Sequence, residues 1–376
     1  MSTPDNIGAK NCAKNPDTAY GDMLERISFL DGLDPASIKR DASVKTYAVT
    51  MPSERWGFLH EAAIVGYNGR LFAAWYNNRK IELSGETPIR FSVSCDGGSS
   101  WSDPITVAAD ESGGILYCPP VFGICGGKLY MLLNQMVSAD HIHSLDLYEY
   151  DEQANSFLII RSAPIPFKLN TNVYTLSDGR LIMPGRAGEL DGFPNTPAVL
   201  ISDSGRIDGE WRLVRIQKDG MLADGTKYVH PEVSLVICGK MYAFCRNDAH
   251  SVPTVYISGD NGENWSLPLA HDIPFSASKI YSGTLSDGRN YVIGNLQPDR
   301  SKLAIFFSEP GTMKFTSGIM LQDGISEEFG FGEAWHYPSA YEYEGKLYII
   351  YTVTVSPDNR RGAVVSIIDL QDYFGR

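Results

Sequence analysis

Residues 344–352 read EGKLYIIYT, a glycine followed by an alternating run of apolar residues, and this pattern decides the fold. It recurs five more times, as NGRLFAAWY (68–76), GGKLYMLLN (126–134), DGRLIMPGR (178–186), CGKMYAFCR (238–246) and DGRNYVIGN (287–295). Successive glycines lie 58, 52, 60, 49 and 57 residues apart. Self-similarity at such a period is typical of repeat architectures, in which each unit is one supersecondary element.

Each repeat is predicted to contain a β-hairpin. A strand-like segment such as HPEVSLVI (230–237) precedes each glycine, and glycine supplies the positive φ that a tight hairpin turn requires. The spacing leaves room for about four strands in each unit. Six such units predict an all-β fold, a six-bladed β-propeller with four-stranded antiparallel blades.

The two ends of the chain are expected to meet in one blade. The last unit lacks a strand, and the stretch VKTYAVTM (44–51) precedes the first repeat. This N-terminal strand is therefore predicted to close the ring and to cover exposed sheet edges. Residues 1–43 are predicted to form a surface extension with a helix near 20–31, and residues 44–376 a single propeller domain.

The composition excludes several classes of function. The 376 residues include 32 basic and 45 acidic side chains, a net charge of −13, which argues against a nucleic-acid partner. No apolar run approaches the roughly 20 residues of a membrane-spanning helix. The N terminus shows no apolar signal segment, and the six cysteines show no zinc-like spacing. We therefore expect a cytoplasmic protein with reduced thiols, without metal or cofactor and without a membrane partner.

Polar residues gather at one end of the predicted hairpins. Positions equally far before and after a hairpin turn lie side by side, so counting from each glycine aligns the innermost hairpins. Three of the seven histidines, His60, His230 and His336, lie nine residues before their glycine. Neighbouring aligned positions hold Glu61, Glu232, Tyr281 and Tyr337 before the glycine and Arg186, Arg246 and Asn295 after it. Because the strand bodies are apolar, these residues predict a ligand site at one mouth of the channel.

Two turns late in the units, SCDGGSSW (94–101) and SGDNGENW (258–265), fit the pattern S-x-D-x-G-x-x-W. The Ser and Asp side chains can hydrogen-bond the turn backbone, and the Trp can pack between blades, so we predict a structural role. These turns resemble the Asp boxes of the sialidase superfamily.

Three further segments resemble sialidases, and the resemblance extends over residues 45–370. They are HPEVSLVICGKMYAFCR (230–246), GNLQPDRSKLAIFFS (294–308) and HYPSAYEYEGKLYIIYT (336–352). The resemblance implies Tyr337 as nucleophile and Glu232 as its base. It also implies that Arg246 and Arg300 bind a substrate carboxylate. A neutral nucleophile avoids repulsion from that carboxylate, and tyrosine is a known exception to the two-carboxylate rule of glycosidases.

Three functions remain open at this stage. The first is a sialidase-type exo-acting glycoside hydrolase that removes a terminal, acidic sugar from an oligosaccharide or glycoconjugate. The second is a lyase or hydrolase of uronate-containing glycans, in which histidines and Tyr337 perform acid–base chemistry. His60 stands where the family has its first arginine, which favours this alternative. The third is a carbohydrate-binding propeller without activity.

The first two functions need a set of catalytic and binding residues. The expected catalytic residues are His60, Glu61, Glu232 and Tyr337. In the hydrolase, Glu82, Glu86, Glu61 or His60 would donate a proton to the leaving group. The expected substrate-binding residues are Arg186, His230, Arg246, Tyr281, Asn295, Arg300 and His336. The loop SADHIHSLD (138–146) and the glutamates Glu327, Glu328 and Glu333 are predicted to roof the pocket rather than to hold a metal.

Overall fold

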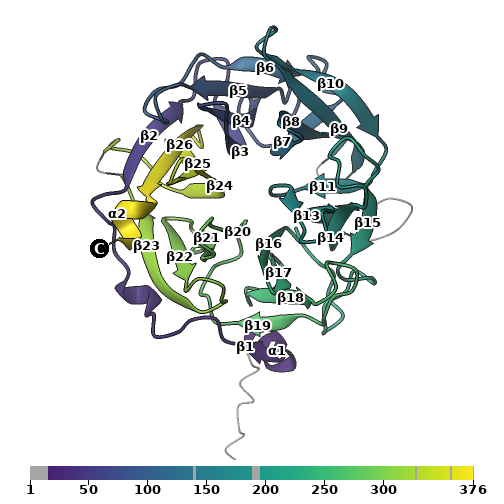
Figure 1. Cartoon of the computed structure of the whole chain (residues 1–376), viewed down its shortest axis with the longest axis vertical. Helices are drawn as coiled ribbons and strands as arrows, with labels where there is room; N and C mark the ends of the chain where they lie inside the picture. The colour runs from purple at the N-terminus through teal and green to yellow at the C-terminus, as the bar shows by residue number, and fades with distance from the viewer. Residues whose placement is uncertain (1–15, 139–140, 189–194, 327, 356–357, 376) are drawn as a thin grey trace, which may run out of the picture.

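The computed structural model describes residues 16–138, 141–188, 195–326, 328–355 and 358–375. Its strands form six sheets arranged radially about one axis, which confirms the predicted six-bladed propeller (Figure 1). All six repeat glycines lie at turns with φ between 66° and 87°. The innermost strands therefore pair with their neighbours through the tight turns that the repeat predicts.

The first three blades follow one another along the chain. Blade 1 contains β3 (Phe58–Tyr67), β4 (Arg70–Asn78), β5 (Ile89–Ser94) and β6 (Ile105–Ala108). Blade 2 contains β7 (Leu116–Cys125), β8 (Lys128–Met136), β9 (Ile142–Asp151) and β10 (Ser156–Ala163). Blade 3 contains β11 (Phe167–Leu169), β12 (Tyr174–Thr175), β13 (Leu181–Ala187), β14 (Thr196–Ser202) and β15 (Arg212–Arg215). Both β11 and β12 pair with β13, so two short strands form the inner edge of blade 3.

The last three blades complete the ring. Blade 4 contains β16 (Val233–Cys238), β17 (Lys240–Cys245), β18 (Thr254–Ser258), β19 (Leu269–His271) and the added strand β1 (Arg26–Ile27). Blade 5 contains β20 (Tyr281–Thr284), β21 (Asn290–Asn295), β22 (Lys302–Ser308) and β23 (Phe315–Asp323). Blade 6 contains β24 (Trp335–Tyr343), β25 (Lys346–Thr354), β26 (Arg361–Asp369) and β2 (Lys45–Thr50). The helices are α1 (Pro16–Met23), the 3-10 turn η1 (Pro35–Ser37) and α2 (Leu370–Phe374).

Ring closure takes place in blade 6, as predicted. The N-terminal strand β2 pairs antiparallel with β26, and the Thr46 and Ser366 hydroxyls lie 2.8 Å apart across this pairing. The outer edge that β26 would otherwise expose is therefore covered by a strand from the other end of the chain. This pairing ties the two ends of the domain together.

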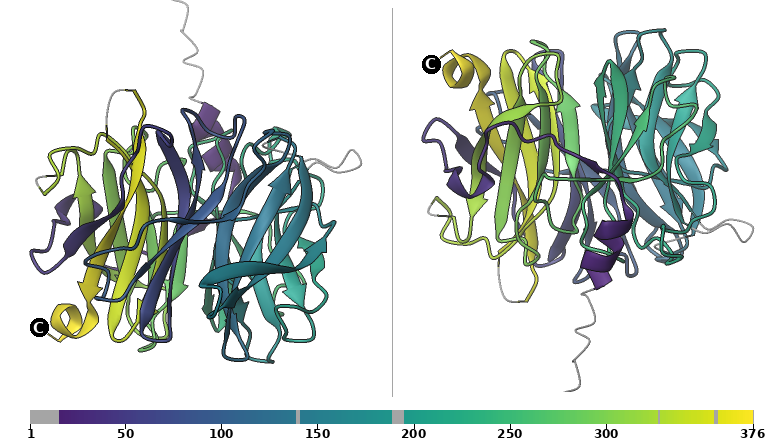
Figure 2. Two further views of the ribbon diagram at one scale, coloured as in Figure 1. Left: turned by 90° about the horizontal axis from the view of Figure 1, so that it is seen from above. Right: turned by 90° about the horizontal axis from the view of Figure 1, so that it is seen from below.

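The described part of the segment before β2, residues 16–44, packs against the ring. It runs across the outside of blades 4 and 5 (Figure 2), where Tyr20 stacks on His250 and Phe29 is buried. The predicted helix near 20–31 is wrong in position, because α1 ends at Met23 and β1 pairs with β19. An extended chain covers about 3.3 Å per residue against 1.5 Å in a helix, which lets this segment reach the cluster between blades 4 and 5.

The core lies between blades rather than along the axis. Six apolar clusters are present in the described residues, one between each pair of adjacent blades. The two predicted tryptophan turns brace these sheets with the same hydrogen bonds. In both, the Ser hydroxyl accepts from the Gly amide and the Trp indole donates to the Gly carbonyl, at Gly98 and Gly262. Because apolar side chains fill the spaces between the sheets, the polar side chains near the propeller axis are not needed for this packing.

Candidate functional site

The two innermost strands of blades 1 and 6 carry the same irregularity at the channel mouth. A β-bulge shifts the register between His60 and Ala63 in β3 and between His336 and Ser339 in β24. Within these bulges Glu61 and Tyr337 adopt left-handed φ values of 51° and 52°. Such a conformation costs a non-glycine residue about 1–3 kcal/mol and is concentrated at functional sites. The bulges re-aim both side chains toward the axis.

Tyr337 lies at the centre of the site. Its phenol oxygen is 2.5 Å from Nη1 of Arg246 in blade 4. Three cations approach its ring face, with Lys279 Nζ at 5.3 Å, Arg300 Cζ at 5.5 Å and Arg246 Cζ at 5.7 Å from the ring centroid. Burial raises the pKa of Tyr337 well above its usual value, and nearby Glu232, Glu61 and Glu82 add to this while Arg246 opposes it. The tyrosine is therefore a neutral phenol at neutral pH.

Arg246 links Tyr337 to two carboxylates. The same Nη1 that contacts Tyr337 donates to Glu232 at 2.7 Å, and Nε and Nη2 donate to the two oxygens of Asp248 at 2.8 and 2.6 Å. Asp248 in turn contacts Nδ1 of His230 at 2.9 Å. Burial disfavours the charge on Glu232, but the attraction and hydrogen bond of Arg246 together with the charge of Lys279 hold the pKa of Glu232 below its usual value. Glu232 is thus an ionised base that shares a donor with the tyrosine.

Glu61 reaches across the axis to three other blades. Its carboxylate lies 3.3 Å from Lys279 Nζ and 3.7 Å from Lys168 Nζ, and it accepts from the Cys118 thiol at 3.1 Å. Burial opposes the charge, but the two lysines lower the pKa of Glu61 to about 2. A carboxyl group with this pKa is ionised at neutral pH, which argues against Glu61 as a proton donor to a leaving group.

The two histidines of blades 1 and 6 pack beside Tyr337. The His60 ring lies 4.2 Å from the Tyr337 ring, and its Nδ1 is 3.3 Å from the Thr352 hydroxyl. His336 Nδ1 accepts from Arg300 Nη1 at 2.9 Å, and its Nε2 is 2.8 Å from the Thr354 hydroxyl. Burial and neighbouring cations lower the pKa of both histidines well below its usual value. Both are therefore neutral, and His336 positions Arg300.

The remaining predicted residues divide between the mouth and the channel wall. Arg186 is buried and lies opposite Lys168 in the β11–β13 pairing. The Asn295 amide is part of the wall, because it accepts from Ser278 and donates to the Trp335 carbonyl. Tyr281 lies deeper in the channel, where its hydroxyl donates to the Ala340 carbonyl at 2.7 Å.

Four charged residues of the site escaped sequence analysis. Lys279 shares the aligned position of the three histidines, a signal that was present but not used. Asp248 follows Arg246 by two residues, and Lys168 lies on β11, outside the glycine register. Arg361 begins β26, and its Nη1 is buried with no hydrogen-bond partner among the described residues. Of these four, Asp248, Lys168 and Arg361 lie outside the positions that the count from the glycines aligns.

Two carboxylates of the loop between β4 and β5 differ in their surroundings. Glu86 contacts Arg55 at 3.4 Å and Arg79 at 3.7 Å, so two cations hold it outside the tyrosine cluster. Glu82 is exposed, and its charge acts on Tyr337, Tyr76 and Arg361. Of these two, Glu82 is the carboxyl group that faces the mouth.

The mouth has no arrangement of metal ligands in the part of the chain that the structure describes. His60 and His336 are adjacent, with ring centroids 5.8 Å apart, but His230 is held by Asp248 in blade 4. Asp140 and Glu327, which were predicted to roof the pocket, lie outside the described residues. The described groups can bind an anion through Arg300 and Lys279, and they combine a phenol with an ionised base.

Comparison with known proteins gives one family match. The profile of the BNR repeat-like domain matches residues 69–349. No curated protein matches the chain.

Several solved structures share the fold. A protein of unknown function from Dyadobacter fermentans has a TM-score of 0.68 at 12% identity, covering 87% of this chain and 99% of that one. Trypanosoma rangeli sialidase has a TM-score of 0.65 at 15% identity, covering 90% and 60%, and has been solved with sialic acid. Leech intramolecular trans-sialidase has a TM-score of 0.66 at 12% identity, covering 88% and 71%. The chain spans about 60% of the Trypanosoma rangeli sialidase, and at these identities the likeness shows the fold alone.

Proposed function

The chain belongs to the BNR repeat-like family, and from this premise we propose that it is an exo-acting glycoside hydrolase that removes a terminal acidic sugar from a glycan at the channel mouth. The observation that carries the proposal is the contact of Arg246 Nη1 with both the Tyr337 phenol and the Glu232 carboxylate. A phenol beside an ionised base is the arrangement that an activated tyrosine nucleophile requires.

In the proposed reaction Tyr337 attacks the anomeric carbon of the terminal sugar. Its phenol proton passes to Glu232, a bond forms between the phenol oxygen and the anomeric carbon, and the glycosidic carbon–oxygen bond breaks. A proton passes from Glu82 to the departing oxygen. In the second half Glu82 takes a proton from the attacking water, the bond between the anomeric carbon and the Tyr337 oxygen breaks, and Glu232 returns its proton to the phenol oxygen. Two displacements at one carbon return the original configuration.

The substrate charge follows from the cations around the nucleophile. Arg300 and Lys279 approach the ring of Tyr337, and among the described residues no carboxylate contacts Arg300, whereas Arg246 is neutralised by Glu232 and Asp248. A carboxylate on the sugar would form an ion pair with Arg300. This ion pair would become stronger when the sugar displaces water from the mouth. Sialic acid, which the Trypanosoma rangeli enzyme binds, is therefore the first sugar to test.

The test uses 3′-sialyllactose and follows anomeric proton signals by NMR. We expect release of the sugar with retained configuration, and a loss of at least a thousandfold in Tyr337→Phe. The matched control is Tyr348→Phe, a buried tyrosine of the same blade outside the mouth. If sialosides are inert, terminal uronic acid glycosides are tested next. Intact glycans from both classes would contradict the hydrolase and favour a binding protein.

A lyase acting on uronate is the second candidate, because His60 lies against Tyr337 in place of a first-blade arginine. Here a neutral base removes the proton next to the carboxylate, the bond to the leaving oxygen breaks, a carbon–carbon double bond forms, and the leaving oxygen is protonated. A rise in ultraviolet absorbance on uronate polymers, lost in His60→Ala, would identify this reaction. The hydrolase produces no such rise.

A further inference from the structure

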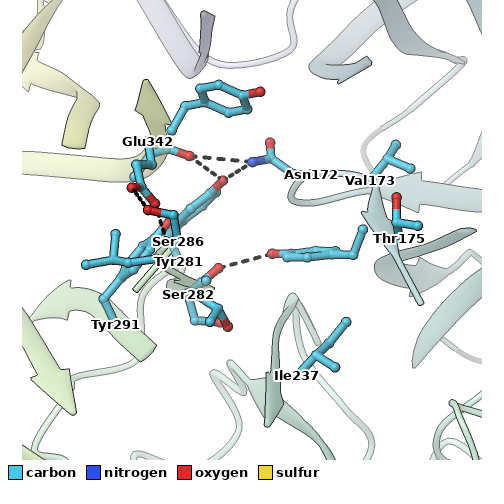
Figure 3. A pocket seen from close by; sticks show the side chains of 15 residues that line it. Asn172, Val173, Thr175, Ile237, Tyr281, Ser282, Ser286, Tyr291 and Glu342 are labelled. Atoms are coloured by element: carbon cyan, nitrogen blue, oxygen red, sulfur yellow. Dashed lines mark hydrogen bonds between the residues drawn. The ribbon is translucent and has the colours of Figure 1, made fainter. Parts of the chain in front are cut away.

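A cavity lies near the hairpin turns at the end of the channel away from Tyr337. It has a volume of about 530 Å³ and is lined by strands of blades 3, 5 and 6 with Ile237 of blade 4 (Figure 3). Asn172, Tyr281 and Ala340, from three different blades, are joined by hydrogen bonds across the channel. These three residues line the cavity themselves, and its other lining residues lie toward the hairpin turns of their blades.

The side chain of Tyr291 lines this cavity. Tyr291 is only 5% exposed, and its hydroxyl has no hydrogen-bond partner among the described residues. Its ring stacks on Tyr281, with centroids 6.4 Å apart. A methyl group on Gly283 would lie 2.5 Å from the Tyr291 hydroxyl, so only glycine at 283 leaves room for the phenol in this position. The hydroxyl is not among the enclosed polar atoms of the described residues that lack a partner, so it is open to the cavity and can bond a ligand there.

Glu342 presents an oriented carboxylate to the same space. The Ser286 amide donates to one of its oxygens at 2.6 Å and the Ser286 hydroxyl to the other at 2.5 Å (Figure 3). Each oxygen keeps a further lone pair, so the carboxylate can accept two adjacent hydroxyl groups from a ligand. The lining residues include no lysine, arginine or histidine, and the cavity therefore does not attract an anion.

We propose that this cavity is a second carbohydrate site, which binds a neutral sugar unit. The tyrosine rings would pack against the apolar face of the sugar, Glu342 would accept two of its hydroxyls, and the Tyr291 phenol would bond a third. The volume is within the range of small-ligand sites, roughly 300–1,000 Å³. The inference goes beyond the hydrolase proposal, because none of these residues belongs to the Tyr337 cluster.

The test measures the binding of two probes, lactose and cellobiose, by saturation-transfer NMR and by titration calorimetry. We expect both to bind wild-type protein, and we expect affinity to fall at least fivefold in Tyr291→Phe and at least tenfold in Glu342→Gln. The matched controls are Tyr348→Phe and Glu344→Gln, which change the same groups outside the cavity. Tyr337→Phe serves as the mouth variant and should bind the probes as wild type does.

Other outcomes would overturn the proposal. Absence of binding by both neutral disaccharides removes the site, and unchanged affinity in both cavity variants places the sugar elsewhere. Glucuronate or tetramethylammonium binding more tightly than the disaccharides would contradict the neutral class. If Tyr291→Phe does not fold, Glu342→Gln and its Glu344→Gln control decide alone. Loss of binding only in Tyr337→Phe would assign the sugar to the mouth.

Discussion

The two ends of the channel are made from the same hairpins and differ in their chemistry. At the mouth, Glu61, Glu232 and Asp248 contact lysines and arginines, and Tyr337 lies among three cations. At the turn end, the Glu342 carboxylate is held by a serine and no cation lines the cavity. Apolar clusters between adjacent blades hold the sheets together, whereas these charged groups lie at the strand ends.

This contrast teaches how a protein of net charge −13 can gather cations at one site. The local field at the mouth, not the total charge, decides which ligand approaches. The buried cations of the mouth are paired with buried carboxylates. Removing one partner of such a pair should therefore destabilise the folded protein. The turn end has no such dependence. Substitutions at the two ends should therefore differ in their effect on stability.

The largest effect is expected for Arg246→Met. The substitution leaves Glu232 and Asp248 without their shared cation, and breaking a buried ion pair costs about 3–5 kcal/mol. We expect a comparable loss in the free energy of unfolding, measured by urea titration of tryptophan fluorescence, and complete loss of activity. The double variant with Glu232→Gln should recover part of the stability and none of the activity. Wild-type stability in the single variant would contradict this account.

The next effect compares Glu61→Gln with Glu342→Gln. The pKa of Glu61 is lowered to about 2 in the folded protein, so its contribution is present above the unfolded pKa of about 4.3 and is lost as the pH falls toward 2. Glu61→Gln should therefore cost on the order of 2–3 kcal/mol at pH 7 and should flatten the acid limb of the stability curve. Glu342→Gln removes a carboxylate that is held by a serine rather than by lysines, so it should cost less at pH 7. Parallel curves of the free energy of unfolding against pH for wild type and Glu61→Gln would contradict this account. They would mean that the contacts between Glu61 and the two lysines do not contribute to stability.

A smaller effect is expected at the turn end from Gly283→Ala. The added methyl group would meet the Tyr291 phenol, and overpacking of this kind costs typically 1–3 kcal/mol. We expect sugar binding at the turn end to be lost while hydrolysis at the mouth persists. The control is Gly259→Ala, because nothing lies within 4 Å of the added atom. Equal loss of activity and sugar binding would mean that the two ends are not independent.

The repeat glycines made the fold predictable, because a left-handed turn favours glycine and glycine can be recognised in the sequence. The same conformation at Glu61 and Tyr337 leaves none, since both are ordinary residues held by a bulge. The count from Gly239 did bring Glu232 and Arg246 together, and the structure joins them at 2.7 Å. Their hairpin has no bulge between the turn and the pair, so the count stays in register.

The rest of the site depends on contacts between blades, which the count within one hairpin does not address. Lys168 reaches Glu61 from β11, a short strand that replaces part of the usual inner strand of blade 3. Arg361 comes from the third strand of blade 6. The pKa of Glu61 is lowered by two lysines of other blades, so the sequence of its own repeat could not predict it.

The smallest effect is expected from Ser286→Ala at the turn end. The substitution removes the hydroxyl that donates to Glu342 but keeps the backbone amide, which donates to the other oxygen at 2.6 Å. Ser286 is exposed, so we expect the free energy of unfolding to change by less than about 0.5 kcal/mol. Lactose affinity should fall two- to threefold by calorimetry, because the carboxylate loses one of two restraints, while activity at the mouth is unchanged. A loss as large as that of Glu342→Gln would mean that the serine hydroxyl itself contacts the sugar.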